Sequence, residues 1–379
     1  MTQAPRFIMI GGFLGAGKTT TIARLAAQFR SAGQRVVIVT NDQASDLVDT
    51  LFLRTQGFDV GEVAGSCFCC NFDELTRTVE SLGESARPDV ILAEPVGSCT
   101  DLVATVIRPL EQVYDQRFRI APYGVIIKPS HGFKILGESS KEPGTDGTEL
   151  NGSLTGGFSP KAEYIFRKQI EEADFVILNR ADELSSERLD QLTANLAAQY
   201  PGMPVVRMSA KTGMGFDALH AIIDGPGAVG SRAMEVDYDT YAEGEAELGW
   251  LNCQVEVRAA SAIDVDRFLI GLLQRLQAAL AAIGAEVAHL KAIAIADGGQ
   301  AVANLVSSVG EPVLSLASES QANDINLVIN ARVGLDPDRL TAVVEQAISQ
   351  QSDGVGARGK VISLQSFRPG RPVPTHRLV

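Results

Sequence analysis

In the first 225 residues, short apolar segments follow one another along the chain, separated by segments with helix-like spacing of apolar residues. Short, almost continuous apolar runs occur at 7–10, 35–40, 89–94, 123–128, 174–179 and 205–209, and helix-like spacing falls between them, as at 20–29, 186–199 and 215–223. Continuous apolar runs are typical of strands covered on both faces, as in a parallel sheet with flanking helices. The pattern predicts a doubly wound α/β domain over residues 1–225, with ligands at the carboxyl ends of its strands.

A different pattern begins after residue 250. Residues 251–258 alternate apolar with polar positions, which predicts a strand with one solvated face. Asp264 is a suitable cap for a helix with a regular apolar stripe that closes at Gly284, and Asp336–Pro337 begins a last helix. Further strand signals occur at 292–296 and 325–331. We expect a smaller α+β domain over residues 250–379, joined by a Gly-rich and then acidic linker at 226–249.

Two segments fit neither pattern. Residues 137–160 are rich in Gly, Ser and Thr and predict a mobile surface loop, either a plain insertion or a functional lid. The tail after Asp353 has three prolines and five basic residues but no acidic one. Such a tail can dock an acidic partner, remain solvated or lie back on its own acidic protein.

Charge and cysteine content narrow the classes of function. The net charge is −13 over 379 residues, and an acidic surface disfavours nucleic acid as a general partner. No apolar stretch is long enough to cross a membrane, and the N-terminus lacks signal-peptide features, so we expect a cytoplasmic protein without a membrane partner. Three of the five cysteines crowd together, which in a reducing compartment indicates metal binding or thiol chemistry rather than a disulfide framework.

The segment GGFLGAGKTT at residues 11–20 contains the spacing G-x-x-x-x-G-K-T from Gly12 to Thr19. Its position between a predicted strand and a predicted helix indicates a phosphate-binding loop. Lys18 is expected to reach the outer phosphates and Thr19 to face Mg²⁺. The predicted nucleotide contacts in this loop are Gly12, Gly15, Ala16, Gly17, Lys18, Thr19 and Thr20.

Two later motifs favour guanine as the base. Asn179-Arg180-Ala181-Asp182 ends a strand and resembles the N-K-x-D motif, in which the Asp carboxylate accepts two hydrogen bonds that adenine cannot supply. Asn179 is expected to brace the loop and Arg180 to stack over the base. Ser209-Ala210-Lys211 resembles the S-A-K loop whose backbone meets the guanine oxygen. The alternative for Asp182 is a helix cap.

Acidic residues at strand ends are candidates for magnesium and water. Glu94 ends the strand at 89–94, and Gly97 follows at a position from which its N–H could sense the γ-phosphate. Asp42, after the strand at 35–40, is a second magnesium or switch candidate, or a helix cap. The predicted catalytic residues are Lys18, Glu94 and Asp42.

Cys67, Cys69 and Cys70 form a C-x-C-C motif. A tight turn there would direct two or three thiolates at one Zn²⁺, Co or Cu ion. The alternative, a buried strand using Cys as a small apolar residue, would need burial on both faces.

Together these motifs resemble the CobW-type metallochaperone GTPases, relatives of the GTPases that insert nickel into hydrogenase and urease. The resemblance covers roughly residues 7–223 and, more weakly, 325–348. It implies binding of GTP/GDP with Mg²⁺ and hydrolysis of GTP, coupled to delivery of a transition metal (Zn²⁺, Co²⁺, Ni²⁺ or Fe²⁺) held by Cys67, Cys69 and Cys70. The implied partner is a client metalloenzyme or its assembly factor. No arginine finger can be named in the sequence, so turnover is expected to be slow unless a partner or the second subunit of a homodimer supplies one.

The chain departs from the family pattern at several places. Arg180 stands where the family has Lys, and Lys128-Pro129 stands where an acidic residue is frequent. A His-rich tract is lacking, which leaves the metal open.

Two cysteines lie outside the motif. Cys99 falls two residues after Gly97, so we hypothesise that it approaches the C-x-C-C ion in one nucleotide state; the alternative is an ordinary buried Cys. Cys253 is on the apolar face of its strand and is interpreted as core. Two other classes of function stay open: a phosphate-loop kinase of a small metabolite, and a non-catalytic scaffold that uses GTP as a clamp and the thiols as a redox sensor.

Overall fold

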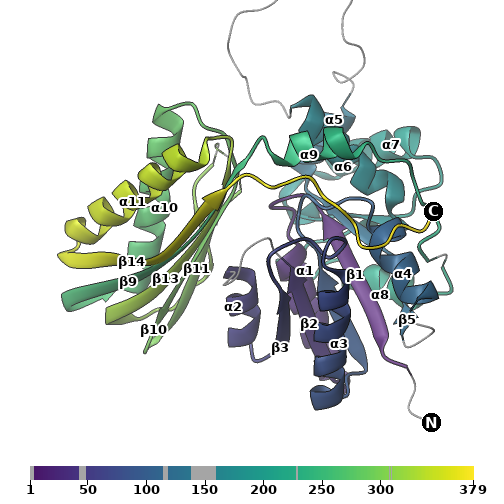
Figure 1. The fold of residues 1–379 in the computed structure, drawn as a ribbon, viewed down its shortest axis with the longest axis horizontal. Helices are drawn as coiled ribbons and strands as arrows, with labels where there is room; N and C mark the ends of the chain where they lie inside the picture. Colours follow the sequence, from purple (N-terminus) through teal and green to yellow (C-terminus); the bar gives the residue numbers. More distant parts are fainter. Residues whose placement is uncertain are drawn as a thin grey trace, which may run out of the picture. The chain divides into compact units, whose positions relative to one another are not determined.

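The computed structural model describes residues 4–41, 48–113, 118–137, 159–227, 229–306, 308 and 310–379. The chain forms two compact units (Figure 1). The first comprises Met1–Asn41, Phe58–Gly244 and Pro372–Val379, and the second comprises Asp42–Gly57 and Glu245–Arg371.

The first unit is built on a parallel sheet with the strand order β3-β2-β4-β1-β6-β7-β8, and β5 pairs with β1. Its strands are β1 Arg6–Gly12, β2 Val36–Asn41, β3 Asp59–Val63, β4 Val90–Glu94, β5 Arg119–Ile120, β6 Gly124–Ile127, β7 Phe175–Leu178 and β8 Val205–Arg207. Every residue of β4, β6 and β7 is buried, which explains their continuous apolar sequences. The predicted doubly wound α/β class is confirmed.

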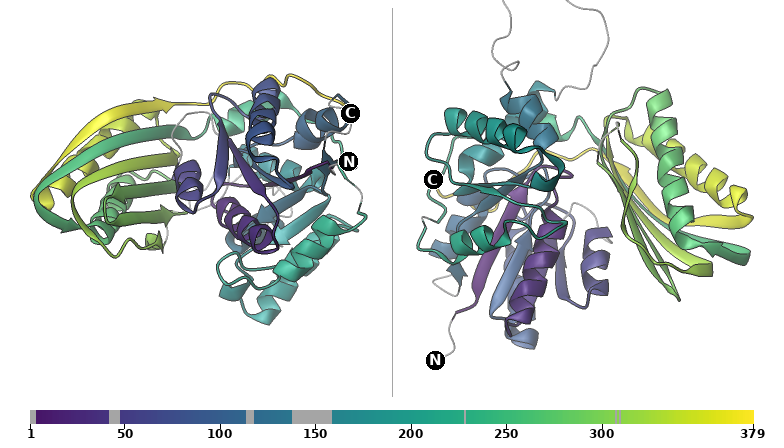
Figure 2. Two further views of the ribbon diagram at one scale, coloured as in Figure 1. Left: turned by 90° about the horizontal axis from the view of Figure 1, so that it is seen from below. Right: turned by 180° about the vertical axis from the view of Figure 1, so that it is seen from behind.

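Helices of the first unit connect these strands and cover both faces of the sheet; Figure 2 shows α1 and α3 on opposite sides of it. The helices are α1 Lys18–Ser31, α3 Phe72–Ala86, α4 Arg108–Gln112, α5 Pro129–Leu136, α6 Pro160–Glu172, α7 Ser186–Gln199, α8 Phe216–Asp224 and α9 Tyr238–Glu245, with a π-helical turn at Val103–Ile107 and a 3-10 turn at Ala181–Glu183. Because all described strand pairs run parallel, the loops after β1, β2, β4, β6, β7 and β8 meet at one edge.

The second unit is an antiparallel sheet with the strand order β12-β11-β10-β13-β9-β14. Its strands are β9 Gly249–Asp264, β10 Val287–Ala296, β11 Gly299–Leu305, β12 Val313–Leu316, β13 Gln321–Val333 and β14 Ala357–Phe367. Helices α10 Val265–Ala282 and α11 Pro337–Gly354 cover one face (Figure 1). The α+β expectation is confirmed, and Cys253 is buried in this core as expected.

The opposite face of this sheet is partly covered by α2, Val48–Thr55. Val48 packs with Ile293, Val302 and Val328, which alternate along their strands with residues of the main core. The Val48 N–H also donates to the Asn330 side-chain oxygen at 2.8 Å. A segment between β2 and β3 therefore belongs to the second unit, a division that residue order alone did not predict.

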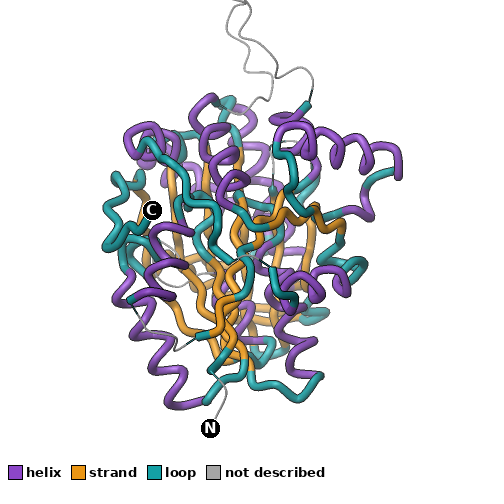
Figure 3. The backbone as a smooth tube through the Cα atoms, turned by 90° about the vertical axis from the view of Figure 1, so that its right-hand side faces the viewer, coloured by secondary structure: helices purple, strands orange, loops and turns teal. Residues whose placement is uncertain are grey.

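Two other expectations need correction. The predicted linker at 226–249 contains α9, and the predicted tail after Asp353 contains β14, whose backbone pairs with β9 along its length. Residues 368–379 form neither helix nor strand (Figure 3). Most of the predicted mobile loop at 137–160, namely 138–158, lies outside the described residues, and so does Asp42.

Candidate functional site

The phosphate-binding loop joins β1 to α1. Gly12 and Gly17 have φ of 129° and 102°, a conformation that side chains disfavour, and a Cβ on Gly17 would lie 2.3 Å from the Asn179 amide nitrogen. Lys18 Nζ donates to the Gly12 carbonyl at 2.9 Å, so its ammonium lies inside the curled loop. Gly15 and Ala16 complete the loop, and Thr20 is exposed in the first turn of α1.

A hydroxyl and a carboxylate meet beside this loop. Thr19 Oγ1 donates to Glu94 Oε1 at 2.9 Å, and both residues are buried. These hard oxygen donors, next to a phosphate cradle, fit the ligand chemistry of Mg²⁺. Thr19 and Glu94 are thus brought together as predicted, while the proposed role of each remains a prediction.

Asn179 ties the loops after β7 and β8 to the phosphate-binding loop. Its Nδ2 donates to the Ala16 carbonyl at 2.8 Å, and its Oδ1 accepts from the Ala210 N–H at 2.9 Å. One buried amide therefore braces the phosphate loop and the Ser209-Ala210-Lys211 loop together, which agrees with the bracing role predicted for Asn179. Ala210 and Lys211 also accept through their carbonyls from Arg24 of α1, at 2.9 and 2.7 Å.

In the same loop, Arg180 is half-buried and Asp182 is exposed. Arg180 adopts a left-handed conformation with φ of 59° and pairs with Glu183 at 3.6 Å, while Asp182 is exposed in a 3-10 turn. The Ala181 N–H donates to the Met208 carbonyl at 3.0 Å, which sets this loop beside the strand that leads into Ser209. The Asp182 side chain is accessible from solvent, and its reading of a base remains a prediction.

Lys128 directly follows β6 and is buried. Burial, with a smaller effect of Arg180, lowers the pKa of Lys128 to about 7. Lys128 is therefore a buried, titratable cation directly after β6.

The C-x-C-C motif forms a tight turn immediately before α3. The Cys70 and Asn71 N–H groups both donate to the Cys67 carbonyl, at 3.0 and 2.9 Å. Sγ of Cys67 lies 2.9 Å from that of Cys69 and 3.1 Å from that of Cys70, and the Cys69–Cys70 separation is 3.7 Å. Thiolates about 2.3 Å from a tetrahedral zinc stand roughly 3.8 Å apart, so small movements would fit the three sulfur atoms to one ion. Elsewhere in the described chain, no comparable group of His, Cys and acidic side chains occurs.

The thiols share their protons unequally. Hydrogen bonds from Cys69, then from Cys70 and Cys99, hold the pKa of Cys67 well below its usual value. The same bonding to Cys67 raises the pKa of Cys69 and raises that of Cys70 to about 12. The cluster favours one thiolate shared with neighbouring thiols, and binding of a metal would release the remaining protons.

Asn41 anchors the thiol turn to the sheet. It is the last residue of β2, and its amide nitrogen donates to the carbonyls of Val63 and Ser66, each at 2.8 Å. Its side-chain oxygen accepts from the Phe68 N–H at 2.8 Å. Sequence reasoning missed this residue, and the only signal was a polar residue directly after an apolar strand.

The loop after β4 approaches the phosphate-binding loop. A Cβ on Gly97 would lie 2.9 Å from Lys18 Nζ, so this glycine closely approaches the lysine of the phosphate-binding loop. Gln169 of α6 donates to the carbonyls of Gly97 and Cys99, at 3.1 and 2.9 Å. Gln169 was also missed, although a buried glutamine in an amphipathic helix is a signal for such bracing.

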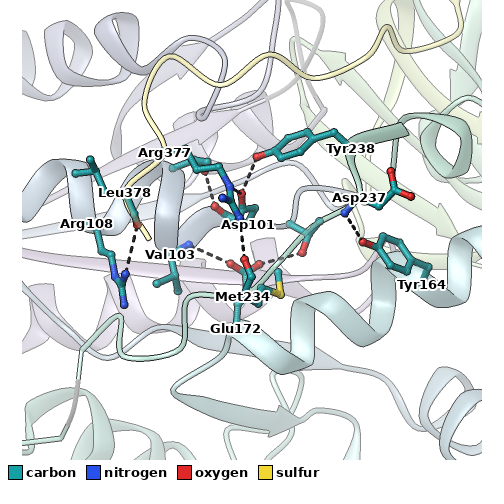
Figure 4. Close-up of polar contacts among 12 residues, drawn as sticks. Asp101, Val103, Arg108, Tyr164, Glu172, Met234, Asp237, Tyr238, Arg377 and Leu378 are labelled. Carbon is teal, nitrogen blue, oxygen red and sulfur yellow. Dashed lines mark hydrogen bonds and ion pairs between the residues drawn. The ribbon is translucent and has the colours of Figure 1, made fainter. Parts of the chain in front are cut away.

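Two carboxyl groups are buried next to this loop, Asp101 in the chain after β4 and Glu172 at the end of α6 (Figure 4). Glu172 accepts from the Val103 N–H at 3.0 Å, and burial raises its pKa to about 8. Asp101 is 1% exposed and accepts from the Tyr238 hydroxyl at 2.6 Å and from Arg377 Nε at 2.7 Å. Arg377 therefore supplies the positive charge that the buried Asp101 carboxylate needs.

The chain belongs to the CobW/HypB/UreG family, because the sequence profile described as "CobW/HypB/UreG, nucleotide-binding domain" matches residues 6–207. The zinc chaperone CobW from Sinorhizobium sp is 27% identical over 252 residues, which are 64% of this chain and 68% of that protein. The zinc chaperone YeiR of Escherichia coli strain K12 is 32% identical over 90 residues, 24% of this chain and 27% of that protein.

Solved structures of similar proteins are more distant. Zn(II)-bound YjiA GTPase from E. coli has a TM-score of 0.34 at 12% identity, over 92% of this chain and 99% of YjiA. HypB from Helicobacter pylori in complex with nickel has a TM-score of 0.40 at 15% identity, over 59% and 90%. Among the residues that the structure describes, no helix is long and apolar enough to cross a membrane.

Proposed function

We propose that this protein hydrolyses GTP and uses its nucleotide state to control the binding and release of a transition metal ion at Cys67, Cys69 and Cys70. The carrying observation is the position of the thiol turn. Asn41 bonds it to the end of β2, and β2 pairs through Thr40 with Glu94, the acid that meets the phosphate loop. Movement at the strand edge therefore has a short route to the thiols.

Lys18 and the loop amides would neutralise the β and γ phosphates during hydrolysis. Mg²⁺, when bound, adds charge neutralisation, and Thr19 and Glu94 would hold it or its water shell. Gly97 approaches Lys18 closely enough for its N–H to bond the γ-phosphate and to be released when that phosphate leaves. Asp42 remains a second proposed acid.

Guanine recognition rests on Asp182 and on the brace at Asn179. Because Asn179 bonds to both the phosphate loop and Ala210, nucleotide phosphates and base would be held by one connected network. The Asp182 carboxylate would accept two hydrogen bonds that guanine supplies and adenine does not, which favours GTP over ATP. The kinase alternative leaves the thiol turn without a function.

The three thiols of the turn favour binding of soft or borderline metal ions. Thiolates select Zn²⁺ among the common divalent ions, and two relatives are named zinc chaperones. We therefore propose Zn²⁺ as first cargo, with Co²⁺, Ni²⁺ or Fe²⁺ as alternatives. The recipient is proposed to be a client metalloenzyme or its assembly factor, and a homodimer would give a second subunit the opportunity to complete catalysis.

Steady-state hydrolysis of GTP and of ATP by metal-free protein tests this function, repeated with Zn²⁺, Co²⁺, Ni²⁺ and Fe²⁺ added singly. We expect GTP to be preferred and one metal to change its turnover. Cys69→Ser should lose that response but keep GTP binding, whereas Cys253→Ala serves as the matched thiol control. A wild-type protein without metal response, indistinguishable from Cys69→Ser, would contradict the proposal.

A further inference from the structure

Cys70 is the most accessible residue of the three in the thiol turn. Cys67 and Cys69 are buried, whereas Cys70 is half-buried. Cys99, hypothesised from the sequence to approach the ion, is also buried and does not belong to the group of side chains that could share one ion in the described part of the chain. An acceptor that takes an ion from the turn would therefore reach Cys70 first.

The last residues of the chain lie against this turn. Residues 372–378, with the sequence PVPTHRL, form neither helix nor strand and belong to the same compact unit as the turn. The Val373 N–H donates to Cys70 Sγ at 3.2 Å, and the Thr375 N–H donates to the Cys69 carbonyl at 2.8 Å. The Thr375 hydroxyl also donates to the Cys70 carbonyl at 3.3 Å. We call residues 372–378 the strap, because they are bonded to two of the three cysteines.

The prolines of the strap suit it to this position. Pro372 and Pro374 fix their own φ and bias the residue before each of them to extended backbone. The strap therefore loses less conformational entropy when it lies down than a flexible segment would. Val373 and Thr375 keep their N–H groups, and these are the two that donate to the thiol turn.

The strap is also attached beyond the cysteines. His376 packs edge-on against Phe72, the first residue of α3, with ring centroids 5.1 Å apart. The Leu378 N–H donates to the Ala104 carbonyl at 2.8 Å, and the Leu378 carbonyl accepts from Arg108 at 3.4 Å. These contacts hold the strap along the first unit after it has passed the turn.

The strongest attachment of the strap is an ion pair with a buried carboxylate. Arg377 Nε donates to Asp101 at 2.7 Å, and its terminal nitrogen donates to the Met234 carbonyl at 2.8 Å (Figure 4). The Asp101 side chain is 1% exposed and that of Arg377 is 28% exposed. Without Arg377, Asp101 would keep the hydrogen bond from the Tyr238 hydroxyl but lose this positive charge. Because an uncompensated buried charge is costly, Asp101 favours the closed strap.

We propose that the strap closes the thiol turn and limits the exchange of its metal ion, with the ion pair between Arg377 and Asp101 as the latch. When the strap lifts from Cys70, an acceptor thiol would lose its proton and bind the ion. The bond between the ion and Cys70 would then break, and Cys70 would take up a proton. The inference rests on the proposed function for the presence of an ion, but not for the strap. Arg377 has a positioning role, because it acts through Asp101 and the strap rather than on the ion.

Hydrogen exchange of the metal-free, full-length protein, read residue by residue by NMR, tests whether the strap is closed. The amides of Val373 and Thr375 should exchange at least about a hundredfold more slowly than in an unstructured peptide, although no helix or strand contains them. Arg377→Gln should speed their exchange at least about tenfold, the effect of losing one hydrogen bond between charged groups. Exchange at the unstructured rate in the wild type would overturn the proposal.

The rate at which bound Zn²⁺ passes to an excess of chelator tests whether the strap limits exchange. Arg377→Gln should raise that rate at least about tenfold, and Arg377→Lys should lie between it and the wild type. Asp101→Asn should also raise the rate, and the double variant with Arg377→Gln should be no faster than the faster single variant, because both changes break one contact. Arg358→Gln, at an exposed position on β14, should match the wild type.

Urea unfolding verifies that each variant is folded, and Arg377→Lys carries the test if Arg377→Gln does not fold. An unchanged transfer rate in a variant whose strap amides exchange faster would show that the strap does not limit the exchange of the ion. Failure of the wild type to bind Zn²⁺ through the turn would contradict the proposed function, whereas hydrogen exchange of the metal-free protein still decides whether the strap is closed.

Discussion

The backbone N–H of Phe68 donates a 2.8 Å hydrogen bond to the side-chain oxygen of Asn41, and this bond holds the centre of the thiol turn to the end of β2. The two residues are 27 positions apart. Because β2 also pairs with β4, one side chain connects the thiol turn to the strand edge where the phosphates are expected. Asn41 therefore links the thiol turn to the strands that carry the phosphate-binding residues.

Replacing Asn41 with alanine should therefore weaken metal binding as well as stability. The change leaves the Val63 and Ser66 carbonyls and the Phe68 N–H without this partner, at a cost of about 1–3 kcal/mol for such buried groups. Urea unfolding and zinc competition titration measure the two effects. Asn323→Ala, which removes one exposed side-chain bond in the second unit, is the control. Unaltered zinc affinity in a destabilised Asn41→Ala protein would show that the turn keeps its shape without this joint.

Lys18→Ala and Glu94→Gln should each reduce kcat/KM for GTP by about a hundredfold or more. The first removes the positive charge that would stabilise the phosphates, and the second removes the carboxylate proposed to hold Mg²⁺ or its water shell. Single-turnover hydrolysis at saturating Mg²⁺ measures the effect. Lys161→Ala removes an exposed lysine paired with Glu243 and should retain wild-type rates. Normal hydrolysis by the Lys18 variant would place the reaction elsewhere.

Asp182→Asn should exchange base preference. Its amide no longer accepts both hydrogen bonds of guanine but complements the additional carbonyl of xanthine, so GTP affinity should fall about a hundredfold and xanthosine triphosphate affinity should rise. Fluorescent-nucleotide competition measures both. Asp190→Asn, at an exposed ion pair with Arg207, is the matched control. If Asp182→Asn keeps the wild-type preference for guanine, Asp182 does not read the base and acts as a helix cap instead.

Glu172 should make stability depend on pH. Burial raises its pKa to about 8, above the ordinary 4.5, so folding takes up a proton between these two values. Its stabilising contribution is complete below about pH 4.5 and is lost as the pH rises towards 8, with a slope of at most about 1.4 kcal/mol per pH unit. Urea unfolding of Glu172→Gln between pH 6 and 8.5 should show a flatter dependence than wild type. Glu171→Gln, at a partly exposed neighbour, should keep the wild-type slope, and a wild-type slope in Glu172→Gln would contradict the assignment.

Local motifs were readable from the sequence because their chemistry is carried by adjacent residues. The phosphate loop, Asn179 and the C-x-C-C turn each need only a strand end and a few positions, and the structure places all of them at one edge of the parallel sheet. Cys253 was assigned to the core from its alternating strand for the same reason.

Contacts between distant residues were not readable. Gln169 reaches Gly97 across 72 positions, and Arg377 reaches Asp101 across 276. Similarly, the apolar pattern of α2 does not state which sheet covers it, and Val48 packs with strands of the second unit. Each of these contacts depends on tertiary packing. A single basic or amide residue has no local sequence pattern that would indicate its distant partner.

The central claim is that the nucleotide state sets the affinity of the thiol site for its metal. Its most direct test is the zinc dissociation constant of the full-length protein, measured by chelator competition with Mg²⁺ and either GDP or a non-hydrolysable GTP analogue. We predict values that differ at least about tenfold, which corresponds to about 1.4 kcal/mol of coupling between the two sites. Equal dissociation constants in the two states, with zinc still bound by the three cysteines, would contradict the account.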